Sequence, residues 1–326
     1  MIKNVLITGG AGYIGSHISE ILVKNKINIF IVDNLTTGHK QLINKKAKFI
    51  KTDIQNKKKI HQVILNNKID SIIHLAAVLS VGESQKNPKK YVRINVKGTR
   101  NLLEAIKNTH IKNFIFSSTC AVYKDGLTKV NENSKLKPSS IYGKTKLQGE
   151  KDIKNFCKKK KINYGILRFF NVAGAKPSSK IGQINIGDQL FKNLSIETRK
   201  KNPIFKIYGT DYETKDGTCI RDYIHVIDIA DIHFKILKKI DKIKKSKILN
   251  CGYGKGISVR EVIKEFKRYA NKSLKIQLLP KRNGDMVTII ANNQNLLKFI
   301  SWKPKFNKLN KIVKDCLNWE KILEKK

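Results

Sequence analysis

Short apolar runs alternate with longer amphipathic stretches through the first half of the chain. The runs are rich in Val, Ile and Phe and have the length of buried strands. The clearest helical stretches between them span residues 91–108 and 142–160. Alternation of continuous apolar strands with helices is typical of a parallel sheet covered on both faces. We therefore predict a doubly wound α/β domain, with strands at residues 4–8, 28–32, 48–51, 71–75, 113–117 and 164–170.

The second half of the chain has a less regular pattern. Residues 174–187 carry many turn-forming residues, whereas residues 221–239 are helix-like and residues 248–251 are strand-like. A strand this late in the chain indicates a return to the first sheet. We therefore predict a first domain at residues 1–172, rejoined by about 221–251, and a smaller C-terminal α/β lobe within residues 173–326.

Lysine dominates the charged residues and gives the chain a formal net charge of +42. A basic surface attracts polyanions, so a non-catalytic protein that binds nucleic acid is one interpretation. However, only eight of the 67 basic residues are arginine, and the lysines are spread along the whole chain. Runs such as residues 57–59 and 158–161 are typical of exposed helix faces. We predict a solvated basic surface and no specific nucleic-acid partner.

Length and cysteine content limit the class of protein and the compartment in which it is found. With 326 residues, of which 40% are hydrophobic, the chain can bury a substantial core. The five cysteines form no C-x-x-C pair, which suggests neither a disulfide framework nor a metal site and fits a reducing cytoplasm. The N-terminus reaches glycines too early for a signal-peptide core, and no apolar stretch approaches bilayer length. We expect a cytoplasmic protein that does not enter the membrane.

A glycine-rich loop follows the first predicted strand. Gly9, Gly12 and Gly15 stand where this strand must turn into a helix, and Tyr13 and Ile14 lie between the last two. Such glycines allow a tight turn and a close approach of backbone N–H groups to a pyrophosphate, while the helix N-terminus favours the negative charge. The loop predicts a dinucleotide-binding Rossmann domain.

Two acidic residues at strand ends indicate which dinucleotide is bound. Asp33 ends the second strand, where a carboxylate accepts hydrogen bonds from the adenosine ribose and repels the 2′-phosphate of NADP. Asp53 follows the third strand and is placed to reach the adenine amino group, with Ile54 covering the ring. An alternative role for Asp53 is the N-cap of the next helix. We predict NAD as the cofactor, bound by these residues and by Asn34.

A tyrosine and a lysine four residues apart open the helix at residues 142–160. Tyr142 and Lys146 share one helix face, so the ammonium group is expected to lower the pKa of the phenol. A phenolate near neutral pH acts as a general base. Such a pair is common on surface helices, but here it follows a strand that ends at Thr119, at the edge where open α/β sheets bind ligands. The pattern predicts a catalytic site.

These residues resemble the extended short-chain dehydrogenase/reductase superfamily. Thr119, Tyr142 and Lys146 match its catalytic triad, and Asn95 matches the asparagine that supports the active-site geometry; the resemblance also implies that Asn95, Tyr142 and Lys146 bind the cofactor. A helix cap is the alternative role of Asn95. The resemblance narrows to the UDP-galactose 4-epimerases and covers nearly the whole chain, through the stretches at residues 8–16, 74–77, 81–84, 169–175 and 216–226.

The resemblance implies a reaction and its substrate residues. Tyr142 would remove the proton of the sugar 4-hydroxyl of UDP-galactose or UDP-glucose as hydride passes from C4 to NAD; the 4-keto sugar would then turn and take the hydride back on its other face. Asn171 is expected to contact the phosphates, Arg221 and Arg282 to clamp the diphosphate, and Asp285 to hold the uridine ribose. Arginine suits this task because its guanidinium offers a fixed fork of donors. A surface ion pair is the alternative for Arg282 and Asp285.

The sugar pocket leaves the particular sugar open. Thr119 and Tyr142 are expected to contact the sugar, and Ile289 stands where the family carries the gatekeeper of this pocket. A tyrosine there excludes N-acetyl groups and small residues admit them, so a UDP-N-acetylhexosamine or a UDP-pentose is an alternative substrate. A nucleotide-sugar dehydratase is disfavoured, because Cys120 and Ala121 occupy the positions of its Asp-Glu pair. The resemblance also implies a homodimer formed through the two helical stretches at residues 91–108 and 142–160.

Overall fold

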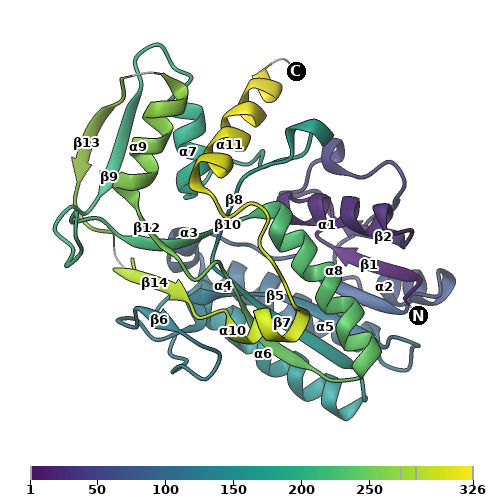
Figure 1. The fold of residues 1–326 in the computed structure, drawn as a ribbon. Coiled ribbons are helices and arrows are strands. Elements are labelled where there is room, and N and C mark those ends of the chain that lie inside the picture. The colour runs from purple at the N-terminus through teal and green to yellow at the C-terminus, as the bar shows by residue number, and fades with distance from the viewer. Residues whose placement is uncertain (1, 272, 283–284, 325–326) are drawn as a thin grey trace.

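The computed structural model describes residues 2–271, 273–282 and 285–324. Within these residues the centre is a seven-stranded sheet whose neighbouring strands are all parallel, in the order β11-β7-β5-β4-β1-β2-β3 (Figure 1). The predicted doubly wound α/β architecture is confirmed. The strands are β1 (Asn4–Thr8), β2 (Asn28–Asp33), β3 (Lys48–Lys51), β4 (Ser71–His74), β5 (Asn113–Thr119), β7 (Asn163–Phe169) and β11 (Lys247–Cys251).

Helices cover both faces of this sheet. On one face, α1 (Tyr13–Lys24) and α8 (Val226–Ile243) pack their apolar residues on the strands to form one buried core. On the other face, α2 (Lys57–Asn66), α5 (Gly98–Ala105) and α6 (Ile141–Lys159) form a second core. Each fully buried Ile or Leu side chain contributes roughly 1.5–3 kcal/mol, so these two layers hold the sheet edge that carries the predicted site.

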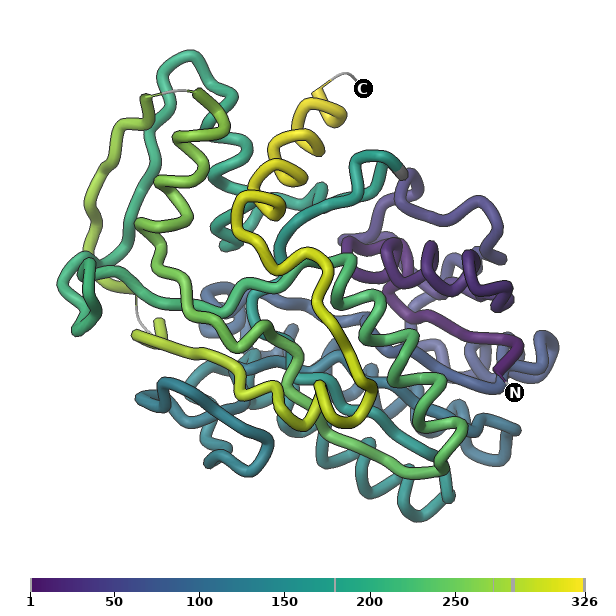
Figure 2. Tube along the Cα trace, viewed as in Figure 1, coloured from purple at the N-terminus to yellow at the C-terminus, as the bar shows by residue number. Residues whose placement is uncertain are grey.

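A second group of elements lies beside the sheet. β10 (Ile220–His225) pairs with β12 (Gly256–Ser258), β14 (Thr288–Ala291) and β8 (Asn171–Ala173), and β6 (Lys129–Val130) pairs with β14. In Figure 2 the chain passes between this group and the sheet more than once, as the return of β11 to the sheet requires. The other elements here are α7 (Leu190–Glu197), β9 (Ile204–Tyr208), α9 (Val259–Ala270), β13 (Lys275–Leu279) and α11 (Leu309–Glu324), whereas α10 (Gln294–Ile300) packs against β11 and α8 of the central sheet.

Two predicted helices are corrected by the structure. Residues 221–225 belong to strand β10, and the helix α8 begins only at Val226. The predicted helix at residues 91–108 is divided into α4 (Pro88–Tyr91), a π-helical segment at Val92–Lys97 and α5. Segments of π-helix are rare and are often found at functional sites. The short helix α3 (Val81–Lys86) precedes this region.

The two lysine runs that were predicted to be exposed lie on helix surfaces, and the cysteines lie in the interior. Lys57, Lys58 and Lys59 are exposed on α2, as are Lys158 and Lys159 at the end of α6. All five cysteines are buried and unpaired. Among the described residues, no helix is long and apolar enough to cross a bilayer, and no cluster of three or more His, Cys, Asp or Glu is arranged to hold a metal ion. The division into two domains stays a prediction.

Candidate active site

Glycine shapes the loop between β1 and α1. Gly9 has a φ of +73°, and a Cβ atom on it would lie 2.7 Å from the backbone nitrogen of Ala76. A Cβ atom on Gly15 would lie 2.6 Å from the carbonyl oxygen of Gly9. Gly12 is the N-cap of α1, and no side chain caps this helix end. The first-turn N–H groups are therefore open to an anion, and the cradle fits a pyrophosphate.

The predicted adenosine residues form one connected group at the ends of β2 and β3. The Asp33 carboxylate accepts hydrogen bonds from the backbone N–H of Ala11 at 3.0 Å and of Leu35 at 2.8 Å, and burial raises its pKa. The Asn34 amide donates to Asp53 at 2.7 Å. Ile54 is buried in the core on the α2 and α5 side of the sheet. The Asp33 carboxylate, which is predicted to hydrogen-bond the ribose, therefore also holds the glycine loop.

The alternative role of Asp53 as a helix cap is wrong. The N-cap of α2 is Asn56, whose side-chain oxygen accepts a hydrogen bond from the backbone N–H of Lys59 at 3.0 Å. Asp53 instead accepts from the backbone N–H of Gln55 at 2.8 Å. This turn leaves Asp53 three residues before the cap, beside Asn34.

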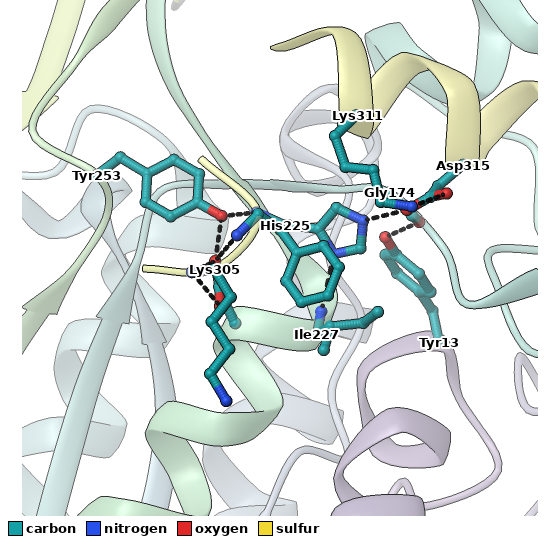
Figure 3. A network of polar contacts seen from close by, with 10 residues as sticks. Tyr13, Gly174, His225, Ile227, Tyr253, Lys305, Lys311 and Asp315 are labelled. Atoms are coloured by element: carbon teal, nitrogen blue, oxygen red, sulfur yellow. Dashed lines mark hydrogen bonds and ion pairs between the residues drawn. The ribbon is translucent and has the colours of Figure 1, made fainter. Parts of the chain in front are cut away.

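Tyr13 ties the glycine loop to the C-terminal part of the chain (Figure 3). Its phenol donates to the carbonyl oxygen of Gly174 at 2.5 Å. Gly174 packs against the ring of His225, whose Nε2 lies 3.1 Å from the Asp315 carboxylate on α11. Lys311 also donates to Asp315, at 2.7 Å. Tyr13 thus positions α1 as well as lying in the predicted cofactor loop.

Thr119 and Tyr142 meet where β5 ends and α6 begins. Ser140 caps α6 by accepting from the backbone N–H of Gly143 at 3.0 Å. A Cβ atom on Gly143 would lie only 2.3 Å from the carbonyl oxygen of Ala121, so glycine allows the helix to approach the end of β5. The Thr119 hydroxyl lies near enough to the Tyr142 phenol to lower the pKa of that phenol. The structure therefore brings these two predicted catalytic residues together.

Burial dominates the titration of Tyr142 and Lys146. It raises the pKa of the buried Tyr142 phenol, and the hydrogen bond from Thr119 opposes this only in part. The predicted lowering of the phenol pKa by Lys146 is not found, because the group that lowers this pKa is Thr119. Burial also lowers the pKa of Lys146 to about 7, while Glu150 raises it. The Lys146 ammonium lies 4.6 Å from the centroid of the Phe116 ring.

The Asn95 side chain connects two segments by hydrogen bonds and does not cap a helix. It lies inside the π-helical segment and is 3% exposed. Its side chain accepts from the backbone N–H of Val78 at 2.9 Å and donates to the carbonyl oxygen of Val78 at 3.1 Å. It also donates to the Thr145 hydroxyl at 3.1 Å. Asn95 therefore joins the segment after β4 to α6, next to Lys146.

Two further residues shape the site, and no role was predicted for either. His74 ends β4 and lies 2.7 Å from the Thr8 hydroxyl and 2.9 Å from the Thr99 hydroxyl; burial lowers its pKa to about 3, so it is neutral. The Ser84 hydroxyl accepts from the backbone N–H of Tyr142 at 3.1 Å. Both residues lie in stretches that carry the family resemblance, residues 74–77 and 81–84, but a stretch of sequence does not reveal these contacts.

Three predicted substrate residues lie on strands that meet at β10. Arg221 is on β10 itself, Ile289 is opposite it on β14, and Asn171 pairs with Tyr223 on β10 through β8. The Arg221 guanidinium donates to the carbonyl oxygens of Ile220 at 3.0 Å and Val287 at 3.2 Å. The second sheet therefore gathers these residues from three distant segments.

Arg282 and Asp285 form an ion pair with each other. Arg282 donates to the two carboxylate oxygens at 2.9 and 3.3 Å, and its guanidinium lies 5.0 Å from the centroid of the Tyr208 ring. The contact observed is therefore the predicted alternative, an ion pair between Arg282 and Asp285. Because the Arg282 side chain is 47% exposed, this pair contributes little to stability.

Comparisons with known proteins point to one family. The model of the NAD dependent epimerase/dehydratase family matches residues 5–252. The UDP-glucose 4-epimerase of Lactobacillus helveticus is 36% identical over 321 residues, covering 97% of each chain. A UDP-glucose 4-epimerase from Stenotrophomonas maltophila, solved with NAD and formylated UDP-arabinopyranose, aligns with a TM-score of 0.94, 31% identity and 99% of both chains. A UDP-Glc/GlcNAc 4-epimerase from Campylobacter jejuni aligns with a TM-score of 0.85, 38% identity, and 98% and 99% coverage.

These similarities extend over nearly the full length of the chain and of each relative. They confirm the predicted resemblance to 4-epimerases of the extended short-chain dehydrogenase/reductase superfamily. They also confirm NAD as the cofactor, which the glycine cradle and Asp33 fit. The chain belongs to the NAD dependent epimerase/dehydratase family.

Proposed function

We propose that this chain is a UDP-glucose 4-epimerase that interconverts UDP-galactose and UDP-glucose with NAD. The observation that carries the proposal is the meeting of Thr119 and Tyr142 at the end of β5, with Lys146 one helical turn away. The full-length similarity to UDP-glucose 4-epimerases supports it. The carboxyl ends of strands in open α/β sheets are where ligands bind.

NAD would be held by the glycine loop and by the group of Asp33, Asn34 and Asp53, and when bound it supplies the oxidation of the sugar at C4 and the reduction that follows. Tyr142 takes the proton of the sugar 4-hydroxyl and later returns it. Thr119 donates to the phenolate and favours its formation. Because burial opposes the phenolate, the positive charges of Lys146 and of the cofactor must offset this cost.

The nucleotide part of the substrate needs firm binding, since the sugar must turn between the two half-reactions. We propose that Arg221 and Arg282 bind the diphosphate, that Asn171 contacts it, and that Asp285 binds the uridine ribose. On binding, Arg282 and Asp285 would replace part of their mutual contact with contacts to the substrate. This costs little free energy because the ion pair is partly exposed.

Sugars other than galactose and glucose are the second candidate substrates. Ile289 is buried beside Cys120, so the wall of the proposed sugar pocket is aliphatic and smaller than a tyrosine would make it. The structurally similar Campylobacter jejuni enzyme is described as acting on UDP-Glc and UDP-GlcNAc, and the Stenotrophomonas maltophila enzyme holds a UDP-pentose derivative. A dehydratase stays disfavoured, because neither Cys120 nor Ala121 offers a carboxylate.

The substrate test compares three sugars on the purified protein with no added NAD. UDP-galactose, UDP-N-acetylgalactosamine and UDP-arabinose are incubated separately, and the 4-epimers are separated by anion-exchange chromatography. Conversion of UDP-galactose with the highest kcat/KM supports the proposal. Faster conversion of either other sugar would reassign the substrate, and no conversion of any, even with NAD supplied, would contradict 4-epimerase activity.

We further propose a homodimer in the cytoplasm. The π-helical segment with α5, and α6, would form the interface, and Arg100 on α5 already donates to Asp152 on α6 at 2.7 Å across this surface. Light scattering coupled to size-exclusion chromatography would distinguish a dimer from a 37.2 kDa monomer.

A further inference from the structure

Residues 185–188 lie outside every helix and strand and are exposed to solvent. Ile186 among them is 74% exposed, so burial of apolar surface contributes little to holding this segment. The chain just before it is fixed: a Cβ atom on Gly182 would lie 2.6 Å from the Trp319 ring, whose Nε1 donates to the carbonyl oxygen of Gln183 at 2.7 Å. Polar side chains therefore decide where residues 185–188 lie.

Asn185 ties one end of this segment to the loop after β2. Its side-chain amide donates to the carbonyl oxygen of Thr37 at 2.6 Å, and its side-chain oxygen accepts from Nε2 of His39 at 2.5 Å. The backbone N–H of His39 in turn donates to the carbonyl oxygen of Ala11 in the glycine loop at 2.9 Å. Asn185 is therefore anchored on the side of the NAD site that carries Asp33.

Asp188 ties the other end to the segment after β4. Its carboxylate accepts from the Ser80 hydroxyl at 2.7 Å. Ser80 also caps α3 by accepting from the backbone N–H of Glu83 at 3.0 Å, which fixes this anchor. The segment after β4 starts beside the glycine loop, because the backbone N–H of Leu75 donates to the carbonyl oxygen of Thr8 at 3.0 Å. Asp188 is therefore anchored on the opposite side of the glycine loop from Asn185.

The order of the strands places residues 185–188 across the glycine loop. β1 lies between β2 and β4 in the sheet, so the loop after β1 lies between the two anchoring segments. Strands two places apart in a sheet are about 9.5 Å apart, and three residues of extended chain span roughly 10 Å. Because the two lengths agree, residues 185–188 can cross the predicted pyrophosphate cradle only as an almost extended chain.

We propose that residues 185–188 form a strap over bound NAD, which Asn185 and Asp188 fasten and which must open before the cofactor leaves. The inference rests on the proposed function, in which NAD is oxidised and reduced within one turnover. A dehydrogenase that releases its product NADH must let the cofactor exchange in every cycle, whereas an epimerase gains by retaining it. Asn185 and Asp188 are positioning residues in this role, because they act on the cofactor through the strap.

The test is the rate at which NAD leaves the full-length protein. The protein is loaded with isotopically labelled NAD and diluted into excess unlabelled NAD, and the bound label is measured over time. Asn185→Ala removes both contacts to the loop after β2, and Asp188→Ala removes the contact to Ser80. Asn25→Ala is the matched control, because this exposed side chain donates to the carbonyl oxygen of Ile21 at 2.8 Å, at the far end of α1. Thermal unfolding of each variant measures its stability.

Each strap variant should release NAD about 3- to 10-fold faster than the wild type, the factor that corresponds to the loss of a hydrogen bond. The double variant should release it faster than either. Release from the double variant within about twofold of the wild-type rate would overturn the strap, and so would equal acceleration in Asn25→Ala. The rates need no turnover: a wild type that holds NAD but converts no UDP-sugar would contradict the proposed function, whereas the rates alone decide on the strap.

Discussion

Arg221 on β10 lies directly opposite Ile289 on β14, in a parallel pair of strands. Ile289 is 1% exposed and packs with Cys120 and Phe170. Cys120 directly follows Thr119, so this pairing connects the proposed diphosphate-binding arginine to the end of β5. The wall of the proposed sugar pocket is therefore part of a packed core.

Replacing Ile289 by alanine should widen this pocket and change the preference among sugars. We expect the ratio of kcat/KM for UDP-N-acetylgalactosamine to that for UDP-galactose to rise, because the N-acetyl group gains space. The stability should fall by about 2–5 kcal/mol, as for other buried Ile→Ala changes. Ile290→Ala is the control, because the next residue of a strand points to the opposite face. An unchanged ratio would exclude Ile289 as the gatekeeper.

Asn95→Ala should weaken the attachment of α6 to the segment after β4. The change leaves the backbone N–H and C=O of Val78 without their partner, at a cost of about 1–3 kcal/mol for each buried group left unsatisfied, whereas the Thr145 hydroxyl keeps its hydrogen bond to the Tyr142 carbonyl oxygen. We expect a lower midpoint of urea unfolding together with a lower kcat. Thr145→Val, which removes only one of these contacts, should have a smaller effect. Equal stability of Asn95→Ala and wild type would contradict the bridging role.

Gly15→Ala should impair NAD binding. The added methyl group would lie 2.6 Å from the carbonyl oxygen of Gly9, so the loop must shift. NAD content per chain, measured by chromatography after denaturation, should fall well below that of the wild type. Gly126→Ala is the control: a Cβ there meets nothing within 4 Å, and because Gly126, unlike Gly15, has positive φ, this change adds backbone strain outside the loop. A full complement of NAD in Gly15→Ala would mean that this loop does not bind the pyrophosphate.

The free energy of unfolding should fall as the pH drops below about 6.5. Burial lowers the pKa values of His17, His74 and His233 to about 4, 3 and 4 in the folded chain, against 6.5 for an ordinary histidine. Between these values the unfolded chain binds more protons, so acid favours unfolding. Urea unfolding at pH 7 and pH 5 measures the effect. His74→Gln should reduce the difference, while the exposed His110→Gln should not.

The sheet could be predicted from the sequence because its strands are continuous apolar runs. The strand β10 could not, because Asp222 and His225 are buried polar residues that hide its apolar pattern. Asp222 accepts from the backbone N–H of Tyr253 at 2.9 Å, and His225 pairs with Asp315. These partners lie 31 and 90 residues away in the sequence, where no local pattern can reveal them.

Some residues of the proposed site could likewise be located from the sequence, and others could not. The positions of Gly9, Gly15 and Tyr142 follow from local spacing, since each lies at the junction of a strand and a helix. The π-helical segment around Asn95 has no distinct sequence period, and the contacts of residues 185–188 depend on the neighbouring order of β4, β1 and β2. Contacts that depend on the assembled sheet therefore needed the structure.

The most direct test of the proposed function is the conversion of UDP-galactose to UDP-glucose by wild type and Tyr142→Phe, with no NAD added. The wild type should reach an equilibrium mixture of both sugars. Tyr142→Phe keeps the ring but lacks the proton-transferring hydroxyl, so its kcat should fall by roughly 10²–10⁴-fold. Wild-type rates in Tyr142→Phe at equal NAD content would contradict the assignment of Tyr142 as the general base and with it the proposed mechanism.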